Sequence, residues 1–124
     1  MERWKTAVAL KHGGLNCCQA VLAAYADRTE LSPEQLKALG AGFGVGMGCF
    51  EATCGALCAA QMLLGLVKYD ERPLLRDAKA LLRSFEARTG AVQCAALKGI
   101  ASGQVLCPCD QCVRHAVECL EEML

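Results

Sequence analysis

The chain has 124 residues, a length typical of one domain, and we expect residues 1–124 to form a single cysteine-rich domain. It carries 13 basic and 13 acidic residues, so its formal net charge is zero, and only 5% of its residues are aromatic. Without a basic surface field or many rings for base stacking, the composition excludes a typical nucleic-acid-binding protein.

The first third of the chain predicts three helices separated by short turns. The first helix is expected over residues 2–11, before a pair of glycines. The second occupies residues 16–25, where Asn16 is the N-cap and apolar residues follow at helical spacing. The third occupies residues 32–40, because Ser32 is a capping residue and a proline lies in the first turn.

A glycine-rich loop, residues 40–48, follows these helices, with glycine at every second position. No Gly-Lys pair of a P-loop is present, and no strand or G-x-G-x-x-G pattern of a dinucleotide loop, so nucleotide binding is not favoured. Glycine permits close backbone approach. The loop is therefore either a tight connection between helices or a wall that aims N–H groups at a sulfur site.

The remaining chain predicts further helices. A buried helix is expected from about Thr53 to Val67; it is shorter than the roughly 20 residues of a membrane span, so we expect none. An amphipathic helix over 74–89 ends at a glycine, and a short helix includes Cys94. After a loop, Asp110 is expected to cap a last helix. The sequence thus predicts an all-α fold, a compact bundle of about five or six helices with a glycine-rich loop.

Ten of the residues are cysteine, a content that would also suit a secreted disulfide scaffold. The N-terminal residues contain no apolar stretch followed by a cleavage site of small residues, as a secretory signal would. We therefore expect a cytoplasmic protein with reduced thiols. In that compartment, clustered cysteines are more typical of metal, cluster or redox chemistry than of structural bridges.

Several cysteines lie at the starts of predicted helices: Cys17 follows Asn16, Cys54 follows the expected N-cap Thr53, and Cys109 and Cys112 bracket the last start. The helix dipole and free N–H groups there are expected to lower thiol pKa values and favour thiolates. Cys109 and Cys112 form a C-x-x-C pair, a spacing used for metals, clusters and dithiol exchange.

Other cysteines have simpler interpretations. Cys54 and Cys58 are four residues apart and share one helix face, which makes them a poor disulfide and a better pair of metal ligands. Cys18 and Cys119 lie among apolar residues at helical spacing, so we expect them to fill the core as small hydrophobic side chains.

Five motifs occur in order along the chain. They are Asn16-Cys17-x-Gln19-Ala20-Val21-Leu22, Gly42-Phe43-Gly44-x-Gly46-Met47-Gly48, Cys54-Gly55-Ala56, Cys94-x-x-Leu97-x-Gly99 and Cys109-x-x-Cys112-Val113. From about Leu10 to the C-terminus, their order and spacing resemble the small bacterial family of redox-active proteins that is named for its C, GCAxxG, C, C pattern.

The resemblance implies an α-helical fold and kinship with the non-haem part of split-Soret cytochromes, which has a similar cysteine pattern and an iron–sulfur centre. It also implies four principal cysteines: Cys17, Cys54, Cys94 and Cys109. The chain departs from the family pattern in two ways. The family's C-G-A-x-x-G motif ends in glycine, whereas this chain has Ala59 at that position, and Cys58 is an additional thiol.

The first functional hypothesis is an iron–sulfur cluster or similar metal centre used for electron transfer or redox sensing. Its ligands would be the four principal cysteines, with Cys112 as a spare or fifth ligand. Glycine backbone beside the sulfurs would supply N–H groups to the same cofactor: Gly44, Gly46 and Gly55.

Three alternatives remain open. The first is a cofactor-free thiol–disulfide oxidoreductase that uses Cys109 and Cys112, or Cys54 and Cys58. The second is a structural zinc protein, since zinc readily takes four thiolates. The third is a helical partner-binding domain without redox chemistry. The sequence does not name a redox partner protein, and its small glycine- and alanine-rich helices are compatible with a homodimer.

Overall fold

The computed structural model describes residues 2–124, and within them every regular element is helical. In chain order the elements are α1 (Arg3–His12), α2 (Cys17–Ala23), η1 (Ala26–Arg28), α3 (Pro33–Gly40), η2 (Ala41–Phe43), α4 (Gly44–Met47), α5 (Gly55–Lys68), α6 (Leu75–Thr89), α7 (Cys94–Lys98) and α8 (Cys109–Glu121). The only β pairing among these residues is one isolated bridge between Thr53 and Gln93. The all-α prediction is therefore confirmed.

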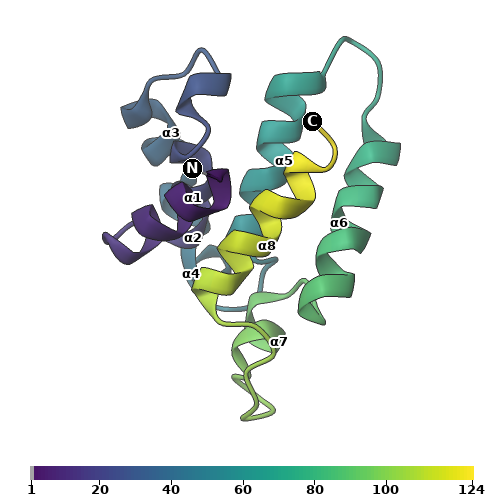
Figure 1. Cartoon of the computed structure of the whole chain (residues 1–124). Coiled ribbons are helices and arrows are strands. Elements are labelled where there is room, and N and C mark those ends of the chain that lie inside the picture. The colour runs from purple at the N-terminus through teal and green to yellow at the C-terminus, as the bar shows by residue number, and fades with distance from the viewer. Residues whose placement is uncertain (1) are drawn as a thin grey trace.

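The last helix, α8, lies at the centre of the arrangement and contacts α1, α2, α5 and α6 (Figure 1). Helix α2 has a similar role among the earlier elements, since it contacts α1, α3, α5 and α8. Helix α7 and the loop after it form a tip at the lower end of the view in Figure 1, beside the first turn of α8. The bundle thus has a packed body and a smaller end that includes α7.

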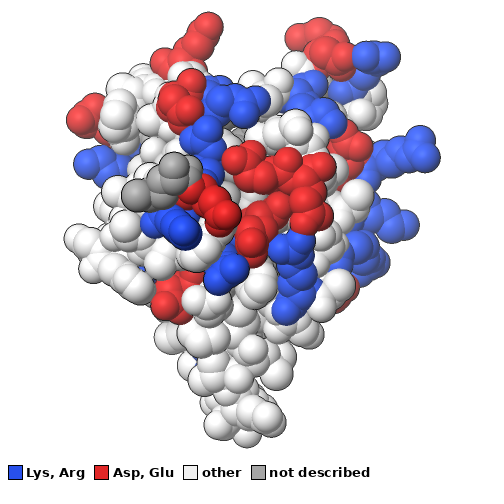
Figure 2. Space-filling view, viewed as in Figure 1, with Lys and Arg blue, Asp and Glu red and all other residues white. Residues whose placement is uncertain are grey.

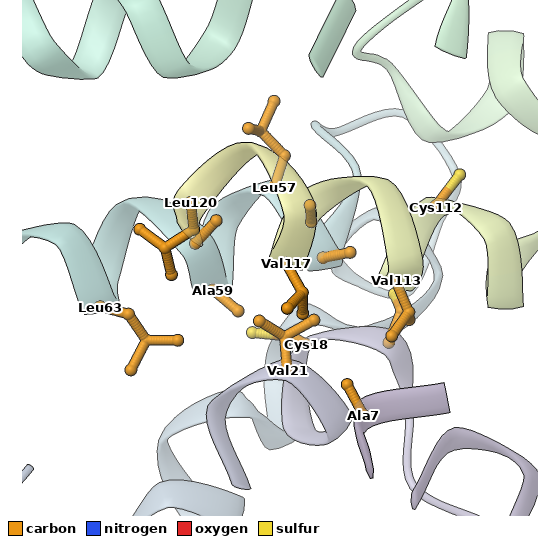
Figure 3. Close-up of a cluster of buried hydrophobic side chains, with 14 of the residues drawn as sticks. Ala7, Cys18, Val21, Leu57, Ala59, Leu63, Cys112, Val113, Val117 and Leu120 are labelled. Carbon is orange, nitrogen blue, oxygen red and sulfur yellow. The ribbon is translucent and has the colours of Figure 1, made fainter. Parts of the chain in front are cut away.

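The core is built from the apolar faces of α2, α5 and α8 (Figure 3). Val113, Val117 and Leu120 of α8 follow one another at helical spacing, and all three are fully buried. They face Val21 of α2 and Leu63 of α5 in one cluster. This i, i+4, i+7 spacing places one face of α8 inside the protein, as an amphipathic helix requires.

Two helices begin with capping boxes, as the sequence predicts. The Gln19 N–H donates to Asn16 Oδ1 at 2.8 Å, and the Asn16 N–H donates to Gln19 Oε1 at 3.1 Å. Ser32 and Gln35 make the same reciprocal pair at the start of α3. Each box satisfies N–H groups that the first turn of a helix leaves without partners.

Two predicted caps are wrong. Helix α5 has Cys54 at its N-cap rather than Thr53, because the backbone at Thr53 pairs with Gln93 instead. Helix α8 begins at Cys109, one residue before the predicted cap Asp110, and Pro108 precedes it with a fixed extended backbone. Both shifts place a cysteine at the start of a helix.

The glycine-rich loop contains a turn of left-handed helix. Val45, Gly46, Met47 and Gly48 all have positive φ, at 55°, 56°, 58° and 83°. The Gly48 N–H donates to the Gly44 carbonyl at 2.8 Å and closes this turn. Left-handed backbone is unfavourable for residues with a side chain, above all for β-branched Val45, so the surrounding structure must hold the turn in place.

Helix α5 is the most apolar helix of the body, yet it has only 14 residues. Within residues 2–124, no helix is long and apolar enough to cross a membrane. The predicted lack of a membrane-spanning helix is confirmed for these residues.

The two capping boxes predict different stability effects. We expect Asn16→Ala to lower the free energy of unfolding by about 1–2 kcal/mol and Ser32→Ala by about 1 kcal/mol or less. The difference arises because Asn16 Nδ2 also donates to the Gly40 carbonyl at 3.2 Å, which ties α2 to the end of α3. Urea unfolding measures both values, and an equal or larger loss for Ser32→Ala would contradict this ranking.

Candidate functional site

The four principal cysteines each stand at the start of a different helix. Cys17 is the first residue of α2, Cys94 the first of α7 and Cys109 the first of α8, while Cys54 is the N-cap of α5. The sequence predicts a helix start for Cys17, Cys54 and Cys109. For Cys94 it predicts only that the residue lies on a short helix. Free N–H groups at a helix start favour negative charge, and α5 and α8 are long enough to have a substantial dipole.

Backbone hydrogen bonds hold two of these helix starts side by side. The Cys54 N–H donates to the Val92 carbonyl at 2.8 Å, and the Cys94 N–H donates to the Ala52 carbonyl at 2.9 Å. These bonds join chain segments that are about forty residues apart in the sequence. They fix the start of α5 against the start of α7 independently of any side chain.

The thiols of the buried cysteines are close enough to interact. Cys54 interacts directly with both Cys17 and Cys112, and Cys112 is fully buried. Cys94 is also buried, and both Cys17 and Cys109 are close enough to influence its charge. Direct interactions thus join Cys17, Cys54 and Cys112, and Cys94 lies within electrostatic range of both Cys17 and Cys109. We call Cys17, Cys54, Cys94, Cys109 and Cys112 the cysteine cluster.

The expected lowering of thiol pKa values does not occur for Cys17, Cys54 or Cys94. Interaction with the Cys54 thiol, together with burial, raises the pKa of Cys17. Interaction with Cys112, with burial adding to it, raises the pKa of Cys54 to about 12. Burial raises the pKa of Cys94. Helix starts favour thiolates, but here desolvation and neighbouring sulfurs outweigh them.

The first turn of α5 nevertheless directs backbone N–H groups at two of these sulfurs. The N–H of Ala56 acts on the Cys17 thiol and that of Leu57 on the Cys54 thiol, and each lowers the pKa of its partner. This effect is smaller than the opposing ones. It shows that α5 presents donors to both sulfurs, as a negatively charged sulfur centre requires.

Two predicted glycines let backbone approach the cysteine cluster. A Cβ on Gly46 would lie 2.6 Å from Cys94 Cβ, and a Cβ on Gly55 would lie 2.9 Å from Cys17 Sγ. Neither distance is compatible with a side chain, so both positions require glycine. The third predicted glycine has another role, because a Cβ on Gly44 would meet the side chain of Asn16 at 2.7 Å. Gly44 packs against the cap of α2.

Lys98 is a member of the site that the sequence analysis missed. Its Nζ donates to the Cys107 carbonyl at 3.4 Å and lies 3.7 Å from Cys112 Sγ. Burial opposes the charged ammonium, but attraction to Cys112, Cys109 and Cys54 outweighs it and raises the pKa of Lys98. The spacing in the sequence could have indicated this role. Lys98 follows Cys94 by four residues and therefore lies on the same face of α7.

The remaining cysteines lie around the cysteine cluster or in the core, and the buried Cys107 is next to Cys112 and Lys98. Cys18 and Cys119 are buried in the hydrophobic core, as predicted, and Ser84 Oγ lies 3.3 Å from Cys119 Sγ. Cys58 is partly buried, and its thiol faces the Thr53 carbonyl at 3.9 Å. Cys49 is exposed on the loop. All ten cysteines are free thiols in this structure.

The described side chains around the cysteine cluster do not form a site for a single metal ion. Within residues 2–124, no three His, Cys, Asp or Glu side chains are placed to hold one ion together. The cysteine cluster therefore offers sulfur donors from four helices without forming a mononuclear cage. On the face shown in Figure 2, charged side chains cover the body of the bundle, and the tip formed by α7 and the next loop is almost all uncharged.

The raised thiol pKa values predict a pH effect on the protein purified with a chelator. The pKa of Cys54 is about 12 in the folded chain against an ordinary 9.0, so its contribution to stability is complete below pH 9 and is lost as the pH rises from 9 towards 12. We expect the free energy of unfolding to fall above pH 9 by about 1.4 kcal/mol per pH unit for each such thiol. Cys54→Ala should make the fall of the free energy of unfolding with pH less steep, and the control Cys49→Ala, at an exposed position, should not change it. An equally steep fall in wild type and Cys54→Ala would contradict the expectation.

Comparisons with known proteins gave one match. Neither the curated proteins nor the solved structures include a significant match to the chain. A protein-family model described as "Putative redox-active protein (C_GCAxxG_C_C)" matches residues 15–123. The matched range spans nearly the whole chain and includes all the principal cysteines and Lys98. The chain therefore belongs to the C_GCAxxG_C_C family of redox-active proteins.

Proposed function

We propose that the protein holds an iron–sulfur cluster through the thiolates of Cys17, Cys54, Cys94 and Cys109 and uses it to transfer electrons or to sense redox state. One observation carries the proposal: four cysteines that are distant in sequence stand at the starts of four helices, Cys17 and Cys54 interact directly, and Cys94 lies within electrostatic range of Cys17 and Cys109. A bound cluster would supply one-electron chemistry, which the protein's own side chains lack.

The arrangement of the donors supports a cluster rather than a single ion. Zinc would need its four ligands to meet around one centre, and no three side chains within residues 2–124 do so. The cysteines of an iron–sulfur cluster bind different irons of a larger inorganic core, so their sulfurs need not converge on one point. Cys112 lies next to Cys54 and remains a spare thiol in this arrangement.

The backbone around the cysteine cluster supports the same proposal. Donors from the first turn of α5 act on Cys17 and Cys54, and Gly46 and Gly55 allow the chain to approach Cys94 and Cys17. Hydrogen bonds to sulfur and exclusion of water are the means by which proteins tune cluster potentials. The site offers both, because Cys17, Cys54 and Cys94 are each less than a tenth exposed.

The proposal extends to location and partners. A cluster of this kind neither makes nor consumes electrons, so it requires a redox partner protein that donates or accepts them. The ten free thiols are compatible with the reducing cytoplasm.

Anaerobic purification tests the proposal directly. We expect iron and acid-labile sulfide in matching amounts and a charge-transfer absorption in the visible region. Cys17→Ser, Cys54→Ser, Cys94→Ser and Cys109→Ser should each lose most of the iron. The matched control is Cys119→Ala, since Cys119 is equally buried but has no cysteine of the cluster beside it. Colourless wild-type protein, even after reconstitution with iron and sulfide, would contradict the proposal, and zinc alone would indicate a structural site.

A second candidate is dithiol exchange by Cys109 and Cys112. The observation in its favour is their C-x-x-C spacing at the start of a helix of 13 residues, with the Lys98 ammonium beside both. The two thiols would together lose two electrons and two protons to a disulfide of the partner. A disulfide would then join Cys109 to Cys112, and the partner would leave as a dithiol.

Protein without iron or sulfide is the sample that tests this candidate. After exposure to a disulfide such as oxidised glutathione, alkylation and mass spectrometry should find a Cys109–Cys112 bridge. Cys109→Ser should abolish the bridge and the associated dithiol activity, and Cys119→Ala should change neither. Full dithiol activity in Cys109→Ser would remove the basis of the candidate.

A further inference from the structure

We propose that Lys98 is the charge-balancing residue of the cysteine cluster: its ammonium offsets the negative charge of the bound iron–sulfur group and raises the reduction potential of that group. This inference rests on the proposed cluster. It assigns a role to a residue that is neither a cysteine nor a glycine of the family motif.

Contacts place the ammonium inside the site. Lys98 Nζ lies 3.7 Å from Cys112 Sγ and donates to the Cys107 carbonyl at 3.4 Å. Cys109 and Cys54 are also close enough to act on its charge. Lys98 shares one face of α7 with Cys94, four residues earlier. Helix α7 therefore begins with the proposed ligand Cys94 and ends with the Lys98 ammonium.

The loop after α7 holds Lys98 in this position. Gly99 caps the C-terminus of α7 with a φ of 71°, and a Cβ there would lie 2.5 Å from the Gln104 backbone. The loop then folds back, and the N–H groups of Leu106 and Cys107 both donate to the Leu97 carbonyl, at 3.0 and 3.2 Å. This return brings the Cys107 carbonyl to the ammonium.

No carboxylate competes with the sulfurs for this charge. Among residues 2–124, Lys98 forms no ion pair with Asp or Glu, whereas Lys68 pairs with Asp77 at 3.2 Å. A partly buried ammonium needs a negative partner or hydrogen-bond acceptors. The acceptors present are a backbone carbonyl and a thiol, so the position suits a site that becomes negative when filled.

The expected effect on potential follows from charge. Reduction adds one electron from the partner to a centre that four thiolates already make negative. A nearby cation stabilises the more negative, reduced state more strongly than the oxidised state. Partial burial limits the screening of this interaction by water and salt, so the effect should persist at physiological ionic strength.

The test compares Lys98→Met, Lys98→Arg and a control, Lys79→Met, on the exposed face of α6. Methionine keeps an unbranched apolar stem and removes the charge. Each protein is purified anaerobically, its iron and sulfide are measured, and its midpoint potential is determined by spectroelectrochemical titration. We expect Lys98→Met to keep its iron and shift to a more negative potential, while Lys98→Arg and Lys79→Met stay close to wild type.

Each other outcome has a distinct meaning. Equal potentials in wild type and Lys98→Met would overturn the role of Lys98 and leave the cluster proposal intact, whereas wild-type protein without iron or sulfide would overturn both. Lys98→Met could keep its helical circular dichroism but bind no iron. In that case, iron binding by Lys98→Arg would support a requirement for the positive charge, and loss of iron from both variants would overturn that requirement. If Lys98→Met does not fold, Lys98→Gln replaces it in the same comparison.

Discussion

Burial of the apolar face of α8 against four other helices is the constraint on which the rest of the structure depends. Val113, Val117 and Leu120 are fully buried, and each contributes on the order of 1.5–3 kcal/mol by leaving water. The same helix begins with Cys109, and one turn later Cys112 is buried beside Cys54. Because α8 has a single apolar face, its packing also determines where its first turn lies. The cysteine cluster is therefore placed by the core, and a change of register in α8 would displace two of its thiols together.

The second constraint is the close approach of backbone to sulfur. The backbone pairing of residues 52–54 with 92–94 brings α5 and α7 together, and Cys94 leaves no room for a side chain at Gly46. At Gly55 the Phe43 carbonyl and the Cys17 thiol leave none. The left-handed turn at residues 45–48 is the conformation by which the loop passes over Cys94. An unfavourable backbone of this kind persists only where its surroundings hold it, and here those surroundings are the site. The glycines are thus explained by two contacts with cysteines and one with the Asn16 cap.

Local signals in the sequence predicted much of the fold. These signals act over only a few residues, so they can be recognised in the sequence alone. They are capping residues such as Asn16 and Ser32, the glycines that end helices and the apolar spacing of the last helix. The errors at Thr53 and Asp110 have a different origin: a long-range bridge to Gln93 and the proline at 108 moved the helix starts. The positions of Cys17, Cys54 and Cys109 near helix starts were also local information. The contact of Lys98 with Cys112, and the raised pKa values of the buried thiols, depend on the packing of distant segments, which no single sequence contains.

The electrostatics of the site join these features. Burial and neighbouring sulfurs keep Cys17 and Cys54 protonated at neutral pH, which makes them weak nucleophiles as free thiols. The same positions receive N–H donors from α5, and a lysine without a carboxylate partner lies beside the adjoining thiols. Donors and a cation have little to stabilise in a set of neutral thiols. The N–H donors and the ammonium would stabilise these sulfurs if the sulfurs were thiolates bound to a metal centre. Metal binding would displace the protons that burial otherwise keeps on the thiols. That asymmetry at Cys17 and Cys54 supports the proposed bound centre over an exchange reaction of these two buried thiols.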